Sequence, residues 1–231
     1  MNQTPWTLIL DFDSTIVQVE SLDELAKIAL KNHPEKDLKI QQIKDLTNAG
    51  MAGEITFESS LQQRLSILES EKKHVSQLSK CLVHEITPSF LAHKDWIRTH
   101  ADSIQVFSGG FREAIFPVAD FFGISHSHIH ANDFIYSEMG NVEGVFTSNP
   151  FSRSGGKVEK AVSMKFDTPI VMVGDGNTDA EMKTLGSQVT FLAFIENVKR
   201  ELVIKKADKV VKSFGEVIRF LKRMDTLNLT Q

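Results

Sequence analysis

The sequence predicts an α/β protein whose mainly parallel sheet is covered by helices on both faces and interrupted by one helical insertion. Two observations support this. Short apolar runs alternate with helical patterns over most of the chain, the order expected of an open parallel sheet. One long stretch near the N-terminus has helical patterns alone. With 231 residues, of which 41% are hydrophobic, the chain can bury a full core.

Four short runs are predicted to form the strands of the sheet. Each is apolar along most of its length, as expected for a parallel strand buried on both faces, and polar residues follow it directly. A weaker fifth run covers residues 209–211. The four stronger runs span residues 6–12, 103–107, 169–173 and 188–194.

Helical patterns fill the intervals between these runs. Two of them end before a glycine, which favours the left-handed conformation that closes a helix. Strand followed by helix, repeated along the chain, predicts a Rossmann-like core. The predicted helices span residues 111–122, 156–164, 179–185, 196–205 and 214–224.

Two segments break the alternation. Residues 21–84 are rich in Leu, Ile, Lys, Glu and Gln and are expected to form a helical insertion. Ser21 and Glu24 have the spacing of a reciprocal N-terminal cap, which predicts a helix start there. Residues 124–151 contain short alternating pieces around a Gly-Asn turn, so we expect a β-hairpin beside the main sheet.

Composition excludes several classes of function. The net charge of −4 argues against a general nucleic-acid binder, and a small-molecule partner is expected. No apolar run approaches the roughly 20 residues of a spanning helix, and the first residues do not resemble a signal peptide, so a cytoplasmic protein is expected. The single cysteine, Cys81, cannot form an intramolecular disulfide and is expected to be a packed thiol. The sequence leaves monomer and homodimer open.

Two carboxylates, Asp11 and Asp13, stand at alternate positions where the first run ends. Ligands of open parallel sheets bind at the carboxyl ends of the strands, so both would face such a site. One could act as a nucleophile and the other as a proton donor and acceptor. The segment, which continues with Ser14 and Thr15, could instead only cap a turn.

Two further segments could bind a phosphate group. Ser108 is followed by Gly109 and Gly110, where a hydroxyl and backbone N–H groups could contact a phosphate without an obstructing side chain. An ordinary strand-to-helix turn is an equally good interpretation of this segment alone. Lys157 is unfavourable to the dipole of the helix that it begins, which favours a functional charge beside a phosphoryl group.

The segment from residue 174 to residue 179 is the most specific of these motifs. A strand leads into Asp175 and Asp179, which are separated by a tight turn at Gly176. Carboxylate oxygens are hard ligands of the kind that Mg²⁺ prefers. The motif therefore predicts a Mg²⁺ site at the same edge of the sheet.

Taken in order, these four motifs resemble those of the haloacid dehalogenase-like phosphatases. The helical insertion resembles a type 1 cap, which implies a core of residues 1–17 and 86–231 and a cap of residues 18–85. Within the insertion, three short segments resemble the phosphoserine phosphatase subfamily. These segments are Val19-Glu20, Met51-Ala52-Gly53 and the stretch from Phe57 to Leu65.

The resemblance implies a role for each matching residue. Asp11 would be the nucleophile, Asp13 the acid and base, and Lys157 a catalytic charge. Mg²⁺ would be held by the Asp11 carboxylate, the Asp13 carbonyl and Asp175, with Asp179 orienting Lys157 or the metal's waters. The residues implied to bind substrate are Glu20 for its ammonium group, Arg64 for its carboxylate, Met51 and Phe57 around the closed pocket, and Ser108, Gly109 and Thr178 near the phosphate.

The activity implied is hydrolysis of O-phospho-L-serine through an aspartyl-phosphate, as the last step of serine biosynthesis. Two alternatives stay open. A relative could act on another small phosphomonoester or transfer the phosphoryl group to an alcohol such as homoserine. A non-catalytic phosphate-binding module could keep the same pocket, although the intact acidic and basic residues argue against it.

Two other patterns are interpreted as structural. His126, His128 and His130 alternate and could bind a metal from one face of a strand, but no further ligand residue supports them, and an exposed hairpin edge explains them. Residues 199–223 are rich in Lys and Arg, but apolar residues recur between them, which favours solvated outer faces.

Overall fold

A six-stranded parallel sheet forms the centre of the computed structural model, which describes residues 4–228. The strand order is β3-β2-β1-β6-β7-β8, and the predicted α/β class is confirmed. Strand β3, at one edge, was not predicted. The strands are β1 (Thr7–Leu10), β2 (Ile104–Phe111), β3 (Ile129–Asn132), β6 (Ile170–Gly174), β7 (Val189–Phe194) and β8 (Lys209–Val211).

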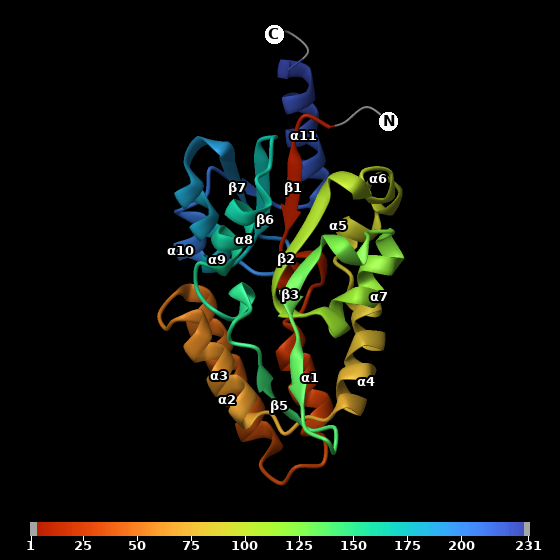
Figure 1. The fold of residues 1–231 in the computed structure, drawn as a ribbon, viewed down its shortest axis with the longest axis vertical. Coiled ribbons are helices and arrows are strands. Elements are labelled where there is room, and N and C mark those ends of the chain that lie inside the picture. The colour runs from red at the N-terminus through yellow and green to blue at the C-terminus, as the bar shows by residue number, and fades with distance from the viewer. Residues whose placement is uncertain (1–3, 229–231) are drawn as a thin grey trace.

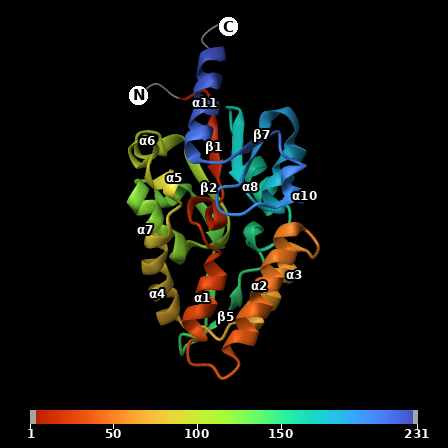
Figure 2. The ribbon, with the colours of Figure 1, turned by 180° about the vertical axis from the view of Figure 1, so that it is seen from behind.

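Helices cover both faces of this sheet (Figures 1 and 2). Strand β1 shows why, because its side chains alternate between two apolar cores: Leu8 and Leu10 belong to one, and Ile9 to the other. The first core includes residues of α5 (Pro88–Leu91), α6 (Lys94–Thr99), α7 (Arg112–Phe122) and α11 (Phe214–Asn228). The second includes residues of α8 (Gly156–Met164), α9 (Asn177–Ala180) and α10 (Glu201–Ile204).

Two predicted boundaries in this core were wrong. Strand β2 does not end before Ser108 but continues to Phe111, so the whole Ser-Gly-Gly motif is extended backbone. The helix predicted at residues 196–205 is reduced to α10. Side-chain bonds explain the loss: Glu196 accepts hydrogen bonds from Ser89, and Asn197 donates to the carbonyl of Ser14, so both residues tie the loop after β7 to the core.

The predicted helical insertion forms four helices beyond the carboxyl end of the sheet (Figure 1). They are α1 (Ser21–Ala29), α2 (Lys36–Ala52), α3 (Phe57–Ile67) and α4 (Lys72–Leu82), and together they are called the cap below. Helix α1 begins at Ser21 as predicted, but the prediction that Ser21 and Glu24 cap each other's backbone N–H groups was wrong. Both the N–H and the hydroxyl of Ser21 donate to Asp13 instead.

The predicted β-hairpin consists of β4 (Phe134–Tyr136) and β5 (Val142–Val145), which form a separate two-stranded sheet, and Phe134 stacks on Phe111 at the end of β2. The tip of the hairpin contacts the connection between α3 and α4, where the Val142 N–H donates to Ser70 and the Lys72 N–H to Gly140. A later part of the chain thus lies against the cap. The division at residues 17 and 86 remains a prediction.

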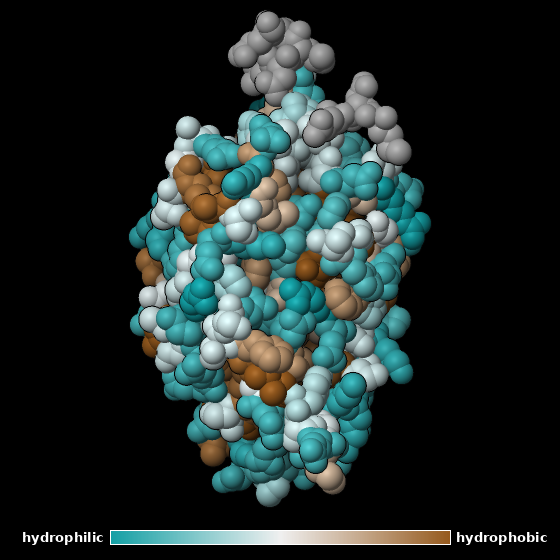
Figure 3. Space-filling model, viewed as in Figure 1, coloured by the Kyte–Doolittle hydropathy of each residue, from teal (hydrophilic) through white to brown (hydrophobic). Residues whose placement is uncertain are grey.

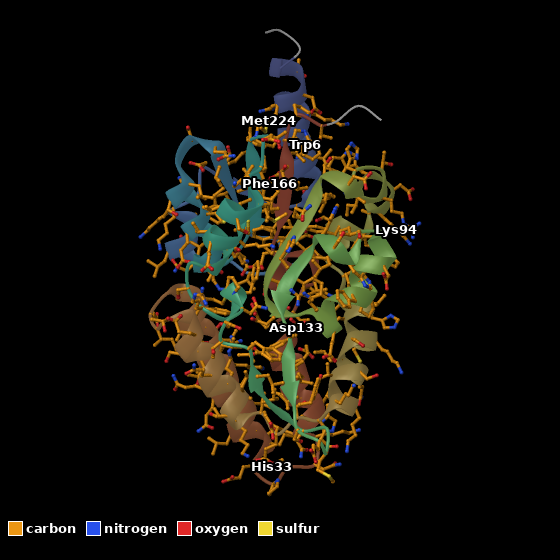
Figure 4. All side chains as sticks on the ribbon, viewed as in Figure 1. Trp6, His33, Lys94, Asp133, Phe166 and Met224 are labelled. Carbon is orange, nitrogen blue, oxygen red and sulfur yellow. The ribbon has the colours of Figure 1, made fainter. Side chains whose placement is uncertain are left out.

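The view of Figure 3 shows a largely hydrophilic surface with separate hydrophobic spots. Cys81 is exposed, so the prediction of a packed thiol was wrong. Between residues 4 and 228, no helix is both long and apolar enough to cross a membrane. In Figure 4, Trp6 lies near the end of the molecule that holds α11, His33 lies at the opposite end, and Asp133 lies between the sheet and the cap.

Candidate active site

The four motifs meet at the carboxyl end of the sheet, facing the cap. Strand β1 is paired with β2 on one side and with β6 on the other, so the residues that follow these strands become neighbours. The pocket is lined by core residues Asp11, Asp13, Ser108, Gly109, Gly110, Lys157 and Thr178, and by cap residues Leu22, Met51, Phe57 and Arg64.

Lys157 forms a buried ion triad with two of the predicted aspartates. Its Nζ lies 2.7 Å from Asp11 Oδ1 and 2.5 Å from Asp179 Oδ1. Burial disfavours the charge on Lys157, but Asp11 and Asp179 outweigh this effect and raise the pKa of its ammonium group. Burial, together with the charge of Asp11, raises the pKa of Asp179 to about 7. Lys157 is therefore charged and holds Asp11 in one orientation.

Asp13 has a different environment from Asp11. Its two carboxylate oxygens accept hydrogen bonds from the N–H (3.1 Å) and the hydroxyl (2.9 Å) of Ser21. Burial raises the pKa of Asp13 well above its usual value, and the nearby charges of Glu20 and Asp11 raise it further. Asp13 therefore carries a proton more readily than an ordinary carboxyl group, which suits a general acid.

The Ser-Gly-Gly motif lines the same pocket as Asp11 and the cap residue Phe57. Ser108 is buried, and its hydroxyl accepts a hydrogen bond of 2.9 Å from the Gly110 N–H. The ring of Phe57 packs so closely on Gly109 that a Cβ atom there would clash with it. Glycine is required at this position for the cap to close over the strand end.

Three buried carboxylates could hold a metal ion. Asp11, Asp175 and Asp179 each present an oxygen, and these oxygens lie within 4.8 Å of one another. Asp175 Oδ1 accepts a hydrogen bond of 3.1 Å from Thr15, and Oδ2 faces the guanidinium of Arg200. Three buried carboxylate oxygens this close together suit a hard divalent cation, so the residues fit Mg²⁺. The Asp13 side chain turns toward Ser21, which leaves only its carbonyl for such a role.

Arg200 is a site residue that the sequence interpretation missed. Its guanidinium forms ion pairs with Asp175 and, at 3.2 Å, with Glu20, and its side chain is only 11% exposed. The sequence pattern predicts solvated outer faces for this basic segment, which is wrong for Arg200. One signal could have found it: Arg200 follows β7, whose carboxyl end lies at the same edge of the sheet as the other motifs.

The predicted cap residues divide into two groups. Met51, Phe57 and Arg64 line the pocket together with Thr178. Glu20 does not line it and instead accepts a hydrogen bond of 2.7 Å from Ser14 as well as the ion pair from Arg200. An ammonium group that reached Glu20 would share it with these two donors.

The pocket is nearly closed, with a cavity volume of about 20 Å³, which is room for one water molecule. The cap must therefore move to admit a substrate. A wider cavity of about 460 Å³ opens beside the sheet near Arg112 and His130. It contains neither the paired aspartates nor Lys157, so the chemistry assigns catalysis to the small pocket.

The three alternating histidines do not form a metal site. His126 and His128 belong to a short 3₁₀ turn, and only His130 lies in a strand. Each has a separate hydrogen-bond partner: Asp120, the carbonyl of Ala101, and Gln105, respectively. This arrangement is consistent with a structural role for the three histidines. The prediction that they lie on the edge of a hairpin was wrong.

Comparison with known proteins agrees with this geometry. The family profile described as haloacid dehalogenase-like hydrolase matches residues 8–183. The chloroplastic phosphoserine phosphatase of Arabidopsis thaliana is 30% identical over 215 residues, which cover 91% of this chain and 70% of the relative. The phosphoserine phosphatase of Bos taurus is 30% identical over 92% of this chain and 91% of the relative.

A solved structure is similar over almost the whole chain. The phosphoserine phosphohydrolase-like protein of Francisella tularensis superposes with a TM-score of 0.83 and 30% identity, covering 93% of this chain and 98% of that one. The resemblance deduced from the four motifs is thereby confirmed. This chain belongs to the haloacid dehalogenase-like hydrolases and, within them, to the phosphoserine phosphatase family.

Proposed function

We propose that this protein hydrolyses O-phospho-L-serine to serine and phosphate through a covalent phosphate on Asp11. The observation that carries this proposal is that one closed pocket is lined both by the buried Arg64 of the cap and by the Asp11–Lys157 pair. A phosphate ester that also bears a carboxylate would bridge these two ends. The relatives named above support the same substrate.

Asp11 and Asp13 divide the chemistry. A carboxylate oxygen of Asp11 forms a bond to phosphorus while the ester bond to the serine oxygen breaks, and Asp13 gives its proton to that oxygen. In the second half, Asp13 accepts a proton from water as the water oxygen attacks phosphorus, which releases phosphate and restores Asp11. The raised pKa of Asp13 favours the proton that the first half needs.

The remaining core residues bind and orient the phosphoryl group. Lys157, fixed by Asp11 and Asp179, offsets its negative charge, while Ser108, the Gly109 N–H and Thr178 are proposed as hydrogen-bond donors to its oxygens. Mg²⁺ would be held by Asp11, the Asp13 carbonyl and Asp175, and would reduce the repulsion between an anionic nucleophile and an anionic substrate.

The cap is proposed to recognise the serine end of the substrate. Arg64 would bind the carboxylate in a two-pronged ion pair, and Glu20 the ammonium group. Met51 and Phe57 would exclude water once the cap closes. A role at the end of serine biosynthesis, a cytoplasmic location and a monomeric or homodimeric state remain predictions from the sequence.

Phosphate release from L-phosphoserine and from a panel of other small phosphate esters tests the proposal. The assay compares Mg²⁺ with a chelator, and wild type with Arg64→Ala and with a control, Arg219→Ala, which removes an exposed arginine of α11. We expect Mg²⁺-dependent preference for phosphoserine, reduced about 100-fold in Arg64→Ala and unchanged in the control.

Each alternative predicts a different result. Turnover of other esters without phosphoserine would overturn the substrate and keep the aspartyl-phosphate chemistry. If added homoserine lowers the amount of free phosphate because the phosphoryl group is transferred to it, the protein is a phosphotransferase. Binding of phosphate compounds without any Mg²⁺-dependent turnover would indicate the non-catalytic module.

A further inference from the structure

A chain of polar side chains crosses the interior of the cap, with one member from each of its first three helices. Arg64 of α3 donates a hydrogen bond of 3.2 Å from Nη1 to the hydroxyl of Thr47 on α2. The Thr47 hydroxyl lies 2.7 Å from Asp23 Oδ1 on α1 and 3.0 Å from the carbonyl of Ile43 in its own helix, and it can donate to either. Thr47 is 2% exposed and Arg64 4%, so this chain is buried in the cap.

Arg64 is unusual because its charge is buried without a direct ion pair. Its Nε donates only a long bond of 3.4 Å to the carbonyl of Ser60, and no carboxylate of the described chain lies within 4.0 Å of its nitrogens. A guanidinium has five N–H donors, so several remain for the pocket that Arg64 lines. An isolated buried charge is strongly disfavoured, and the free cap must compensate it from further away.

Asp23 is the compensating carboxylate that hydrogen bonds link to Arg64, through Thr47. Burial lowers the pKa of Arg64, while the charges of Glu20, Asp23 and Asp13 raise it. Of these three carboxylates, Glu20 is paired with Arg200 and Asp13 with Ser21, whereas Asp23 is bonded to the hydroxyl that holds Arg64. The threonine hydroxyl has one hydrogen and accepts from arginine. Asp23, at 2.7 Å, is a nearer acceptor for that hydrogen than the Ile43 carbonyl at 3.0 Å, and a carboxylate is the stronger acceptor.

We infer that Asp23 and Thr47 are positioning residues that aim the Arg64 guanidinium at a substrate carboxylate. The inference rests on the proposed function. Selectivity for carboxylate-bearing phosphate esters then depends on three helices of the cap, because tilting the planar fork of Arg64 weakens a two-pronged bond to a carboxylate but leaves the phosphate end untouched.

Steady-state kinetics with two substrates test this inference. Phosphoserine is compared with phosphoethanolamine, which has the same phosphate and ammonium groups without the carboxylate. The variants are Asp23→Asn, Thr47→Val, which keeps the shape of threonine without its hydroxyl, and Thr47→Ser, which keeps the hydroxyl. Asp37→Asn changes an exposed aspartate of α2 and serves as the control.

We expect Thr47→Val and Asp23→Asn to lower kcat/KM for phosphoserine about tenfold, mainly through KM, because each weakens one charge-assisted contact. Values for phosphoethanolamine should stay unchanged, and Thr47→Ser and Asp37→Asn should match wild type. Equal losses on both substrates in Thr47→Val and Asp23→Asn would show a merely structural role and overturn the inference.

The same data separate this inference from the proposed function. If wild type does not prefer phosphoserine to phosphoethanolamine, the substrate assignment fails and the positioning role fails with it. If wild type has the preference, and Arg64→Ala loses it while Asp23→Asn and Thr47→Val keep it, only the positioning role fails.

Discussion

The sheet end and the cap interior both bury charged side chains, but they compensate them differently. At the sheet end, Lys157 touches Asp11 and Asp179 directly. In the cap, Arg64 touches only neutral groups, and its nearest bonded carboxylate is one hydroxyl away. The sheet end is therefore organised before any ligand binds, whereas the cap keeps an unpaired cation for an anion that arrives from outside. Four predictions test this contrast, from the largest expected effect to the smallest.

Asp11→Asn should lower the turnover rate by on the order of 10⁴-fold or more, because the amide of asparagine cannot form the covalent bond to phosphorus. The fold should survive, since Lys157 retains Asp179 as a partner. Phosphate release and circular dichroism measure the two effects. Asp167→Asn, which changes an exposed aspartate, is the control. Turnover within tenfold of wild type would rule out Asp11 as the nucleophile.

Lys157→Ala should destabilise the protein by about 3–5 kcal/mol, because it leaves two carboxylates buried without their cation. Arg64 has no direct carboxylate partner that its removal would leave unpaired, so Arg64→Ala should lower the free energy of unfolding far less. Urea unfolding of both variants at pH 7 measures the difference in the free energy of unfolding. Comparable losses would show that the two regions compensate charge in the same way.

Asp23→Asn should stabilise the cap at neutral pH. Burial, and then the charge of Glu20, raises the pKa of Asp23 from 3.8 to about 6, so the folded state binds the proton more tightly than the unfolded one. Stability from this group is present below pH 4 and lost as pH rises through 6. The variant should therefore gain roughly 2 kcal/mol over wild type between pH 4 and pH 7.

Unfolding of Asp23→Asn and wild type across this pH range checks the sign. Combined with weaker phosphoserine selectivity, a gain at pH 7 would mark Asp23 as a residue that favours function over stability. A constant difference between pH 4 and pH 7 would mean that Asp23 titrates normally.

Ser154→Ala should have the smallest effect. The N–H and the hydroxyl of Ser154, in the loop before α8, each donate 3.0 Å bonds to Glu58 Oε2 of the cap. Loss of the hydroxyl should loosen closure and raise KM about threefold on every substrate. Ser163→Ala, at an exposed position of α8, is the control. An effect limited to carboxylate-bearing substrates would place Ser154 with Arg64 instead.

Much of the core was predictable because its signals are local. Buried parallel strands are apolar along their length, and a polar motif after each strand must lie at one edge of the sheet. Asp11, Ser108 and Asp175 could thus be assigned to one site before any distance was known, and Lys157 joined them through its place at a helix start and the resemblance to a family. Short-range patterns failed at β3 and at residues 196–205, where pairing and side-chain bonds to distant segments outweigh local preference.

The sequence by itself determined the class of fold, the nucleophile segment and, through its resemblance to a family, the chemistry. Only the tertiary structure decided which charges are paired. Arg200 is separated from Glu20 by 180 residues, and Asp23, Thr47 and Arg64 come from three different helices. The energy of a charge depends on its burial and its neighbours in space, and chain order does not specify either quantity.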